Sequence, residues 1–229
     1  MKKLAYLLLS SLLAILLTAC FEIREEIEIN PEGSGSYVML VDMSHNKALI
    51  DAFLRNTGES NDEINKTKSE LDTTLLKSVE KFNKIAGISN AKGIDDRQNY
   101  IFGVKFDFAN VEALNEALKQ TNQDRLPQKQ WQPAYAFENK TLERKDNYYV
   151  QGLTDISKTD EGEAEKQEQI KNLLKDATYA YVVRTKGKIR KFSNKQSYLS
   201  ADKKELRWSA KLQDVTERKL TIGNTIKIK

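Results

Sequence analysis

The stretch Phe21-Glu22-Ile23-Arg24-Glu25-Glu26-Ile27-Glu28-Ile29 decides the fold. Its apolar residues stand at odd positions and its charged residues at even positions. This period of two predicts a β-strand with one face in a core and the other in water. Glu25 alone breaks the alternation, because it places a charge on the apolar side. Residues 30–35 are rich in turn-forming types, so 37–43 is expected to return as the second strand of a hairpin.

The rest of the chain alternates between helical and strand patterns. Strands are expected at 88–94, 100–108, 135–142, 148–153, 179–192, 197–199, 206–212 and 220–228, and helices at 44–58, 62–86, 110–118 and 163–177. The hairpin within 135–153 is expected to turn at Asp146-Asn147. Helices grouped between hairpins predict an α+β fold, an antiparallel sheet with helices packed on one side, of which a helix-grip arrangement is one form.

The clearest strand is 100–108, because Tyr100, Phe102, Val104, Phe106 and Phe108 stand at every second position. Aromatic residues at strand spacing usually belong to a core, and we expect Phe102, Val104, Phe106 and Trp208 to be largely buried. A sheet that grips a helix can also leave a cavity for an apolar ligand, so that alternative stays open.

The first twenty residues predict export and lipidation. Met1-Lys2-Lys3 is a short positive start, and 4–17 is almost wholly apolar, as in a secretory signal. An uncleaved anchor is the alternative, although a membrane span needs roughly 20 apolar residues. The run ends in Leu17-Thr18-Ala19-Cys20, which resembles the lipobox of bacterial lipoproteins, where the cysteine thiol receives the lipid. We expect residues 1–19 to be a signal peptide and 20–229 to be a single α+β domain, anchored through Cys20.

The composition narrows the choice of partners. Cys20 is the only cysteine, so lipidation would leave the mature protein without a thiol or a disulfide. The chain has 37 basic and 33 acidic residues, and loss of Lys2 and Lys3 would leave 35 against 33. This near balance gives no argument for a nucleic-acid partner.

The inventory of catalytic side chains is thin. His45 is the only histidine, and it follows Ser44 at an expected strand-to-helix junction. A polar residue in the first helical turn is favoured there over a lone acid or base, since a usable base needs a partner to orient it. No phosphate-binding loop, dinucleotide fingerprint or metalloprotease motif occurs. We expect a protein that is not an enzyme, with no catalytic residues, no cofactor and no metal.

Four cations stand at alternate positions near residue 187, namely Arg184, Lys186, Lys188 and Arg190. On a regular strand all four would project from one face and repel one another. This repulsion is relieved if the cations pair with the charged face of the first strand, at Glu22, Glu26 and Glu28. It is also relieved by contact with an anionic lipid headgroup or an acidic glycan. Internal pairing is the favoured interpretation, and anionic-surface contact is the alternative.

The same region resembles the C-terminal part of the LppM-like lipoprotein domain. In that pattern a strand runs into Pro-Gly-Lys-Val, then Ser-Asn, a turn with aspartate and a strand with tryptophan. Lys186 replaces the proline, and the membrane helix common at the C-terminus of that family is absent. The residues that match are Gly187, Lys188, Ile189, Ser193, Asn194, Asp202 and Trp208. The resemblance implies a membrane-tethered α+β domain similar to helix-grip lipid-binding folds, and it implies no catalytic residues.

These observations together predict a non-catalytic module in the bacterial cell envelope. We expect it to bind lipid or an envelope polymer, while a structural subunit of a membrane-associated assembly is the alternative and an envelope hydrolase is disfavoured. Phe21 stands where inner-membrane lipoproteins of enteric bacteria carry aspartate, which favours the outer membrane. Besides the membrane that holds the lipid, the expected partner is a lipid or a protein.

Overall fold

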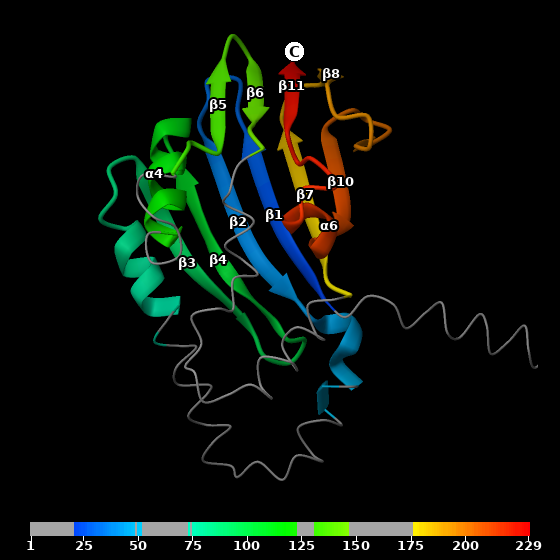
Figure 1. The fold of residues 1–229 in the computed structure, drawn as a ribbon. Helices are drawn as coiled ribbons and strands as arrows, with labels where there is room; N and C mark the ends of the chain where they lie inside the picture. The colour runs from blue at the N-terminus through cyan, green and yellow to red at the C-terminus, as the bar shows by residue number, and fades with distance from the viewer. Residues whose placement is uncertain (1–20, 49, 52–72, 74, 123–130, 147–175) are drawn as a thin grey trace, which may run out of the picture.

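The computed structural model describes residues 21–48, 50–51, 73, 75–122, 131–146 and 176–229 (Figure 1). Its strands are β1 (Glu22–Ile29), β2 (Gly35–Asp42), β3 (Ile88–Asp96), β4 (Ile101–Phe108), β5 (Tyr135–Glu138), β6 (Thr141–Arg144), β7 (Thr178–Thr185), β8 (Ile189–Phe192), β9 (Tyr198–Leu199), β10 (Glu205–Lys211) and β11 (Asn224–Ile228). Its helices are η1 (Ser44–Asn46), α4 (Val111–Asn122) and α6 (Leu212–Thr216).

The strands form two sheets. Sheet A has the order β3-β4-β2-β1-β7-β10-β9, and sheet B has the order β5-β6-β11-β8. Every pairing is antiparallel except the one between β1 and β7, in which Glu22 faces Thr178 and Ile29 faces Thr185. A parallel pair cannot be joined by a hairpin, so the two central strands of sheet A come from distant parts of the chain.

The predicted alternation of β1 is confirmed. Ile23, Ile27 and Ile29 are buried, whereas the even positions lie on the opposite, outer face. The register extends the inner face across the sheet, because Ile27 lies beside Tyr37 on β2 and beside Val183 on β7. Glu25 lies on this inner face with its neighbours and is fully buried.

Sheet B and the helices cover the inner face of sheet A (Figure 1). The Phe106 ring lies 4.9 Å from the Phe82 ring, on the helical segment 75–82, and 5.3 Å from the Tyr37 ring. Phe106 and Trp208 are each 2% exposed, as predicted, whereas Phe102 and Val104 are half-buried. The α+β class, with helices on one side of a mainly antiparallel sheet, is therefore confirmed.

The helix predictions are confirmed in part, since the described residues 83–86 and 176–177 of two expected helices are not helical. Asn110 caps α4 through its side-chain oxygen, which accepts the amide of Ala113 at 2.8 Å. The segment expected at 44–58 begins as the 3-10 helix η1, and 75–82 of the expected helix 62–86 is helical. Residues 52–72, 148–153 and 163–175 lie outside the described part. No helix in the described part is long and apolar enough to cross a bilayer.

Two turns differ from their predicted positions. The strand expected at 135–142 is instead a hairpin, β5–β6, which turns at Asn139-Lys140, and both turn residues have positive φ, 50° and 58°. The turn expected at Asp146-Asn147 reaches residues outside the described part. Two successive positive-φ residues make the tight turn whose twist suits a two-residue hairpin. The expected strand 206–212 ends at Lys211, and Leu212 instead begins α6.

The strand expected at 179–192 is two strands in different sheets. β7 ends at Thr185 in sheet A, and β8 starts at Ile189 in sheet B. Between them Gly187 passes close to the backbone of Lys229, whose carbonyl oxygen would lie 2.7 Å from an added Cβ. The prediction that Arg184, Lys186, Lys188 and Arg190 project from one face of one strand is therefore wrong.

Candidate functional site

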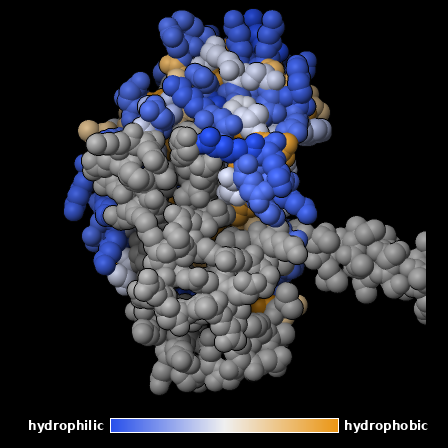
Figure 2. All heavy atoms as spheres, in the orientation of Figure 1, coloured by the Kyte–Doolittle hydropathy of each residue, from blue (hydrophilic) through white to orange (hydrophobic). Residues whose placement is uncertain are grey.

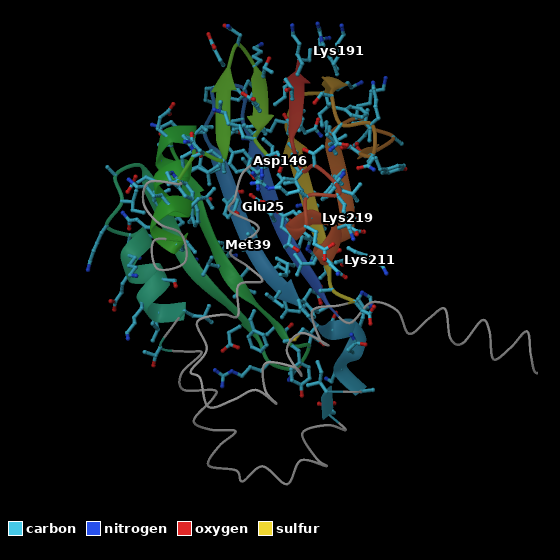
Figure 3. The ribbon with its side chains drawn as sticks, in the orientation of Figure 1. Glu25, Met39, Asp146, Lys191, Lys211 and Lys219 are labelled. Atoms are coloured by element: carbon cyan, nitrogen blue, oxygen red, sulfur yellow. The ribbon has the colours of Figure 1, made fainter. Side chains whose placement is uncertain are left out.

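The polar centre of the molecule is a carboxylate that two sheets enclose. Glu25 of β1 accepts hydrogen bonds from the hydroxyls of Tyr135, at 2.5 Å, and Tyr179. The guanidinium of Arg144 on β6 donates to the same carboxylate at 3.1 Å, and both charged side chains are 0% exposed. Figure 3 labels Glu25 near the middle of the molecule, below Asp146. Residues of β1, β5, β6 and β7 thus meet at one carboxylate.

Aromatic rings complete this buried cluster. The Arg144 guanidinium lies 5.0 Å from the centre of the Tyr135 ring and 5.8 Å from that of Tyr181. Burial and the Glu25 charge raise the pKa of the Tyr135 hydroxyl well above its ordinary value, and burial likewise raises the pKa of Tyr181. Burial alone would lower the pKa of Arg144, but the Glu25 charge outweighs it and raises the pKa. The tyrosines are therefore neutral and the arginine is charged at neutral pH.

A cluster without solvent access cannot receive a ligand in this conformation. Each charge has its counter-charge, and each oxygen of the Glu25 carboxylate accepts at least one hydrogen bond. Such a pair holds two sheets in one register, because any slip would leave a buried charge unanswered. The cluster therefore belongs to the architecture, and a ligand site has to lie on the surface.

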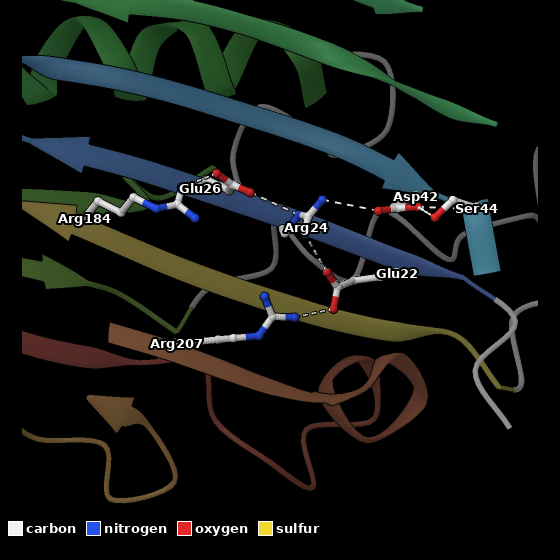
Figure 4. A network of polar contacts seen from close by, with 7 residues as sticks. All are labelled: Glu22, Arg24, Glu26, Asp42, Ser44, Arg184 and Arg207. Atoms are coloured by element: carbon white, nitrogen blue, oxygen red, sulfur yellow. Dashed lines mark hydrogen bonds and ion pairs between the residues drawn. The ribbon is translucent and has the colours of Figure 1, made fainter. Parts of the chain in front are cut away.

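The outer face of sheet A carries a network of paired charges (Figure 4). Arg24 contacts Glu22, Glu26 and Asp42 at 3.0–3.5 Å. Arg207 bonds Glu22 at 2.5 Å. Asp42 also accepts the Ser44 hydroxyl at 2.6 Å. The acidic residues on this part of the face are therefore already engaged.

Arg184 belongs to the same network. Its guanidinium contacts Glu26 and also Glu205, the latter at 2.8 Å. Partial burial would lower the Arg184 pKa, but these hydrogen bonds outweigh it and raise the pKa. The predicted internal pairing is confirmed for Arg184 and Glu26. Glu22 pairs with arginines outside the predicted set of four cations.

The other three predicted cations lie at the end of the molecule where β7 ends. Lys186 and Lys188 occupy the turn into sheet B, and Arg190 lies on β8. All three are exposed, and none forms an ion pair within the part of the chain that the structure describes. The structure thus separates Arg184 from the other members of the set.

Three exposed cations that the sequence analysis does not predict lie on or next to sheet B, as Lys188 and Arg190 do. Lys227 on β11 lies directly opposite Lys191 on β8, and Lys140 lies at the β5–β6 turn. The backbone of β11 ties the group together, since the Ile228 amide donates to the Lys140 carbonyl at 2.9 Å. We call the following five residues the basic face: Lys140, Lys188, Arg190, Lys191 and Lys227.

The basic face carries an excess of positive charge. Glu138 and Glu143 are the exposed acidic residues on sheet B, and neither pairs with the five cations in the described residues. The β8–β11 register shifts between Lys227 and Ile228, which leaves Arg190 as an extra residue, so Arg190 and Lys191 are both exposed. Figure 2 shows this end of the molecule as strongly hydrophilic, and Figure 3 places Lys191 there.

The Ser193-Asn194 pair that carries the LppM-like resemblance has a structural role. Asn224 of β11 accepts the amides of Ser193 and Asn194 at 3.1 and 3.0 Å, and Asn194 donates to the carbonyls of Thr221 and Gly223. These bonds fasten the segment after β8 to β11. They support the strand pair that carries the basic face.

Other candidates from the sequence are not assembled into a site. His45 lies in η1, and in the described part of the chain no three His, Cys, Asp or Glu side chains gather as metal ligands. Phe106 and Phe108 are packed into the core. Tyr100 precedes β4 with a φ of 55° and bonds Asp51 at 2.5 Å. Cys20 lies outside the described residues.

The fold and surface define a two-sheet α+β protein with a buried ionic centre and a basic end. No protein-family model matches the chain, and no curated protein matches it. Among solved structures it is similar to the folded domain of LppM from Mycobacterium tuberculosis, determined by NMR, with 10% identity over 93% of this chain and 91% of that one. The TM-score is 0.39.

Proposed function

We propose that this chain is a non-catalytic binding module of the bacterial envelope, anchored by a lipid on Cys20, which binds an anionic ligand through the basic face. The observation that supports it best is the contrast between two sets of cations. Arg24, Arg184 and Arg207 are paired on sheet A, whereas the five cations of the basic face have no acidic partner in the described residues. Each cation near an anionic surface contributes about 1 kcal/mol of binding free energy, so five exposed cations are enough to bind an anionic ligand.

The direction of β1 indicates on which side of the protein the ligand lies. Phe21 directly precedes β1. The strand β7 runs parallel to β1, and Lys186, in the turn that leads to the basic face, follows the end of β7. Eight residues at a rise of ~3.3 Å each put the basic face roughly 25 Å from the start of β1. That distance exceeds a Debye length of about 8 Å. With β1 upright on the anchoring membrane, the ligand is one presented on the side away from that membrane, such as an envelope polymer.

The described surface gives less support to the structural-subunit alternative. The large hydrophobic residues that are exposed in the described part are Leu76 and Tyr198, on the helix 75–82 and on the edge strand β9. β3 and β9 form opposite edges of sheet A, and Leu76 belongs to the helix that packs near β4. Two separated side chains do not make an apolar docking patch.

A polymer-binding measurement tests the proposal. A soluble form starting at Phe21 would be titrated with dextran sulfate and with neutral dextran of the same length. The wild type should bind only the sulfated chain, and more weakly at high salt. Lys191→Gln/Lys227→Gln should weaken that binding roughly tenfold to thirtyfold, from about 1 kcal/mol per cation.

The matched control removes the same charge elsewhere. Lys81 lies in the helical segment 75–82 and Lys84 follows it, both are exposed, and Phe82 between them packs on sheet A, so Lys81→Gln/Lys84→Gln should leave binding within about twofold. Equal losses in the two variants, or no binding by the wild type, would reject the basic face as the ligand site.

A further inference from the structure

A groove runs along the outer face of sheet A at the same end of the molecule. It consists of two hollows, of about 380 and 480 Å³, which share Ser36 and Asp107. Those two residues face each other on β2 and β4. Lys186 lines the first hollow, and Lys92 and Lys105 line the second. Because the hollows share their central residues, they form one continuous depression.

Two lysines oppose each other at the inner end of this groove. Lys92 on β3 pairs directly with Lys105 on β4, and both side chains are exposed. Like charges directly opposite each other on neighbouring strands destabilise a sheet. Neither lysine forms an ion pair within the described residues. An anionic group between the two ammonium groups would remove the repulsion.

The backbone around Lys92 departs from a regular strand. The β3–β4 register shifts between Ser89 and Lys92, and Asn90 has a φ of 53°. The Asn90 side chain donates to Asp107 at 2.7 Å, on the floor shared by the two hollows. A bulge of this kind re-aims the side chains that follow it, and bulges recur beside binding sites. Here the residue that follows is Lys92.

The lining of the groove mixes cations with hydrogen-bonding oxygens. Three lysines line it, together with the carboxylates of Glu28 and Asp107 and the hydroxyls of Ser34 and Ser36. A uniform polyanion would meet repulsion from both carboxylates. An acidic sugar chain suits both kinds of group, because its anionic groups contact lysines while its hydroxyls donate to carboxylates.

We propose that this groove binds a single chain of an acidic glycan, which continues from the basic face past Lys186 to Lys92 and Lys105. The proposal rests on the proposed function, because Lys186 and Lys188 of one turn join the groove to the basic face. A chain that occupies both surfaces binds more tightly than one that reaches a single surface.

A length series tests the proposal. The soluble form starting at Phe21 would be titrated with uronic-acid oligosaccharides of two and of about ten sugars. The decasaccharide should bind at least about tenfold more tightly than the disaccharide. Lys92→Gln/Lys105→Gln should lose most of that advantage. Its melting temperature should stay equal or rise, because a like-charge pair has been removed.

The outcomes separate the two proposals. If Lys191→Gln/Lys227→Gln weakens binding of the decasaccharide and Lys92→Gln/Lys105→Gln does not, the groove proposal fails and the basic face stands. If no acidic oligosaccharide binds the wild type, both fail. Vesicles containing anionic phospholipid provide the competing arm: if they bind as tightly as the decasaccharide and depend equally on Lys92 and Lys105, a membrane and not a glycan occupies the groove.

Discussion

Arg144 on β6 lies 3.1 Å from Glu25 on β1, and neither side chain reaches solvent. Removing one member of such a pair leaves an unanswered buried charge and typically costs about 3–5 kcal/mol. Arg144→Met should therefore lower the free energy of unfolding by about that amount, measured as the urea midpoint at constant slope. Replacing the exposed Arg190 by Met should change it by less than about 0.5 kcal/mol.

The double replacement Glu25→Leu/Arg144→Met tests whether the ion pair stabilises the folded state or only selects one arrangement of the two sheets. Hydrophobic residues of similar volume often restore or exceed the stability of a buried pair. We expect the double variant to recover most of the loss seen in Arg144→Met. The hydroxyls of Tyr135 and Tyr179 would then lose their acceptor, so recovery should improve when Tyr135→Phe is added. No recovery in either variant would contradict this view of the cluster.

Alkaline pH should unfold the protein through its buried tyrosines. Burial raises the pKa of Tyr135 and Tyr181 in the folded state above the ordinary value of 10.0. The unfolded state therefore releases these protons at lower pH than the folded state does. Their contribution to stability is complete below about pH 10 and declines as the pH rises above it. Tyrosinate absorbance and circular dichroism should change together, and Tyr181→Phe should move the transition to higher pH.

The aromatic core should be sensitive to truncation. Phe106 and Trp208 are each 2% exposed, and Phe106 contacts both Phe82 and Tyr37. Phe106→Ala and Trp208→Ala should each cost about 3–5 kcal/mol, read from denaturant midpoints. Leu76→Ala, at a side chain 64% exposed, should cost less than about 0.5 kcal/mol. Core variants that unfold with the wild type would contradict the packing described above.

Lipidation of Cys20 is tested in the cell. The signal peptidase of lipoproteins acts on the lipidated cysteine, so Cys20→Ser should accumulate as a precursor that keeps residues 1–19. Mass spectrometry of the membrane fraction would show a mature wild-type N-terminus at residue 20 with added acyl mass. An N-terminus at that residue without acyl mass would overturn the lipid anchor.

The fold class could be predicted because the decisive patterns are local. The alternation in 21–29 and 100–108, the turn at 30–35 and the Asn110 cap each predict an element from adjacent residues. The pairing of β1 with β7 could not be predicted, because no local pattern says which distant strand completes a sheet. The break at Gly187 has the same origin, since its cause is the approach of Lys229.

The candidate site was predicted in part. Spacing alone predicts Lys188 and Arg190, but Lys140, Lys191 and Lys227 join them only through the register of sheet B. Spacing also groups Arg184 with them, because it assumes one regular strand. Glu25 was visible in the sequence as the one break in a strict alternation. Its partners were not, because Arg144 and Tyr135 lie in another hairpin.

The position of Glu25 also governs the order in which the chain folds. Its hydrogen-bond partners stand 110, 119 and 154 positions later, and β7 is the neighbour of β1 in sheet A. A nascent chain can close the β1–β2 hairpin early, but the inner face then holds a carboxylate with no cation nearby. Distant contacts of this kind slow folding, because the intervening chain must be brought together first. The cluster around Glu25 is therefore complete only when β7 has been made, and the core is complete only when β10 and β11, which carry Trp208 and Ile226, have joined it.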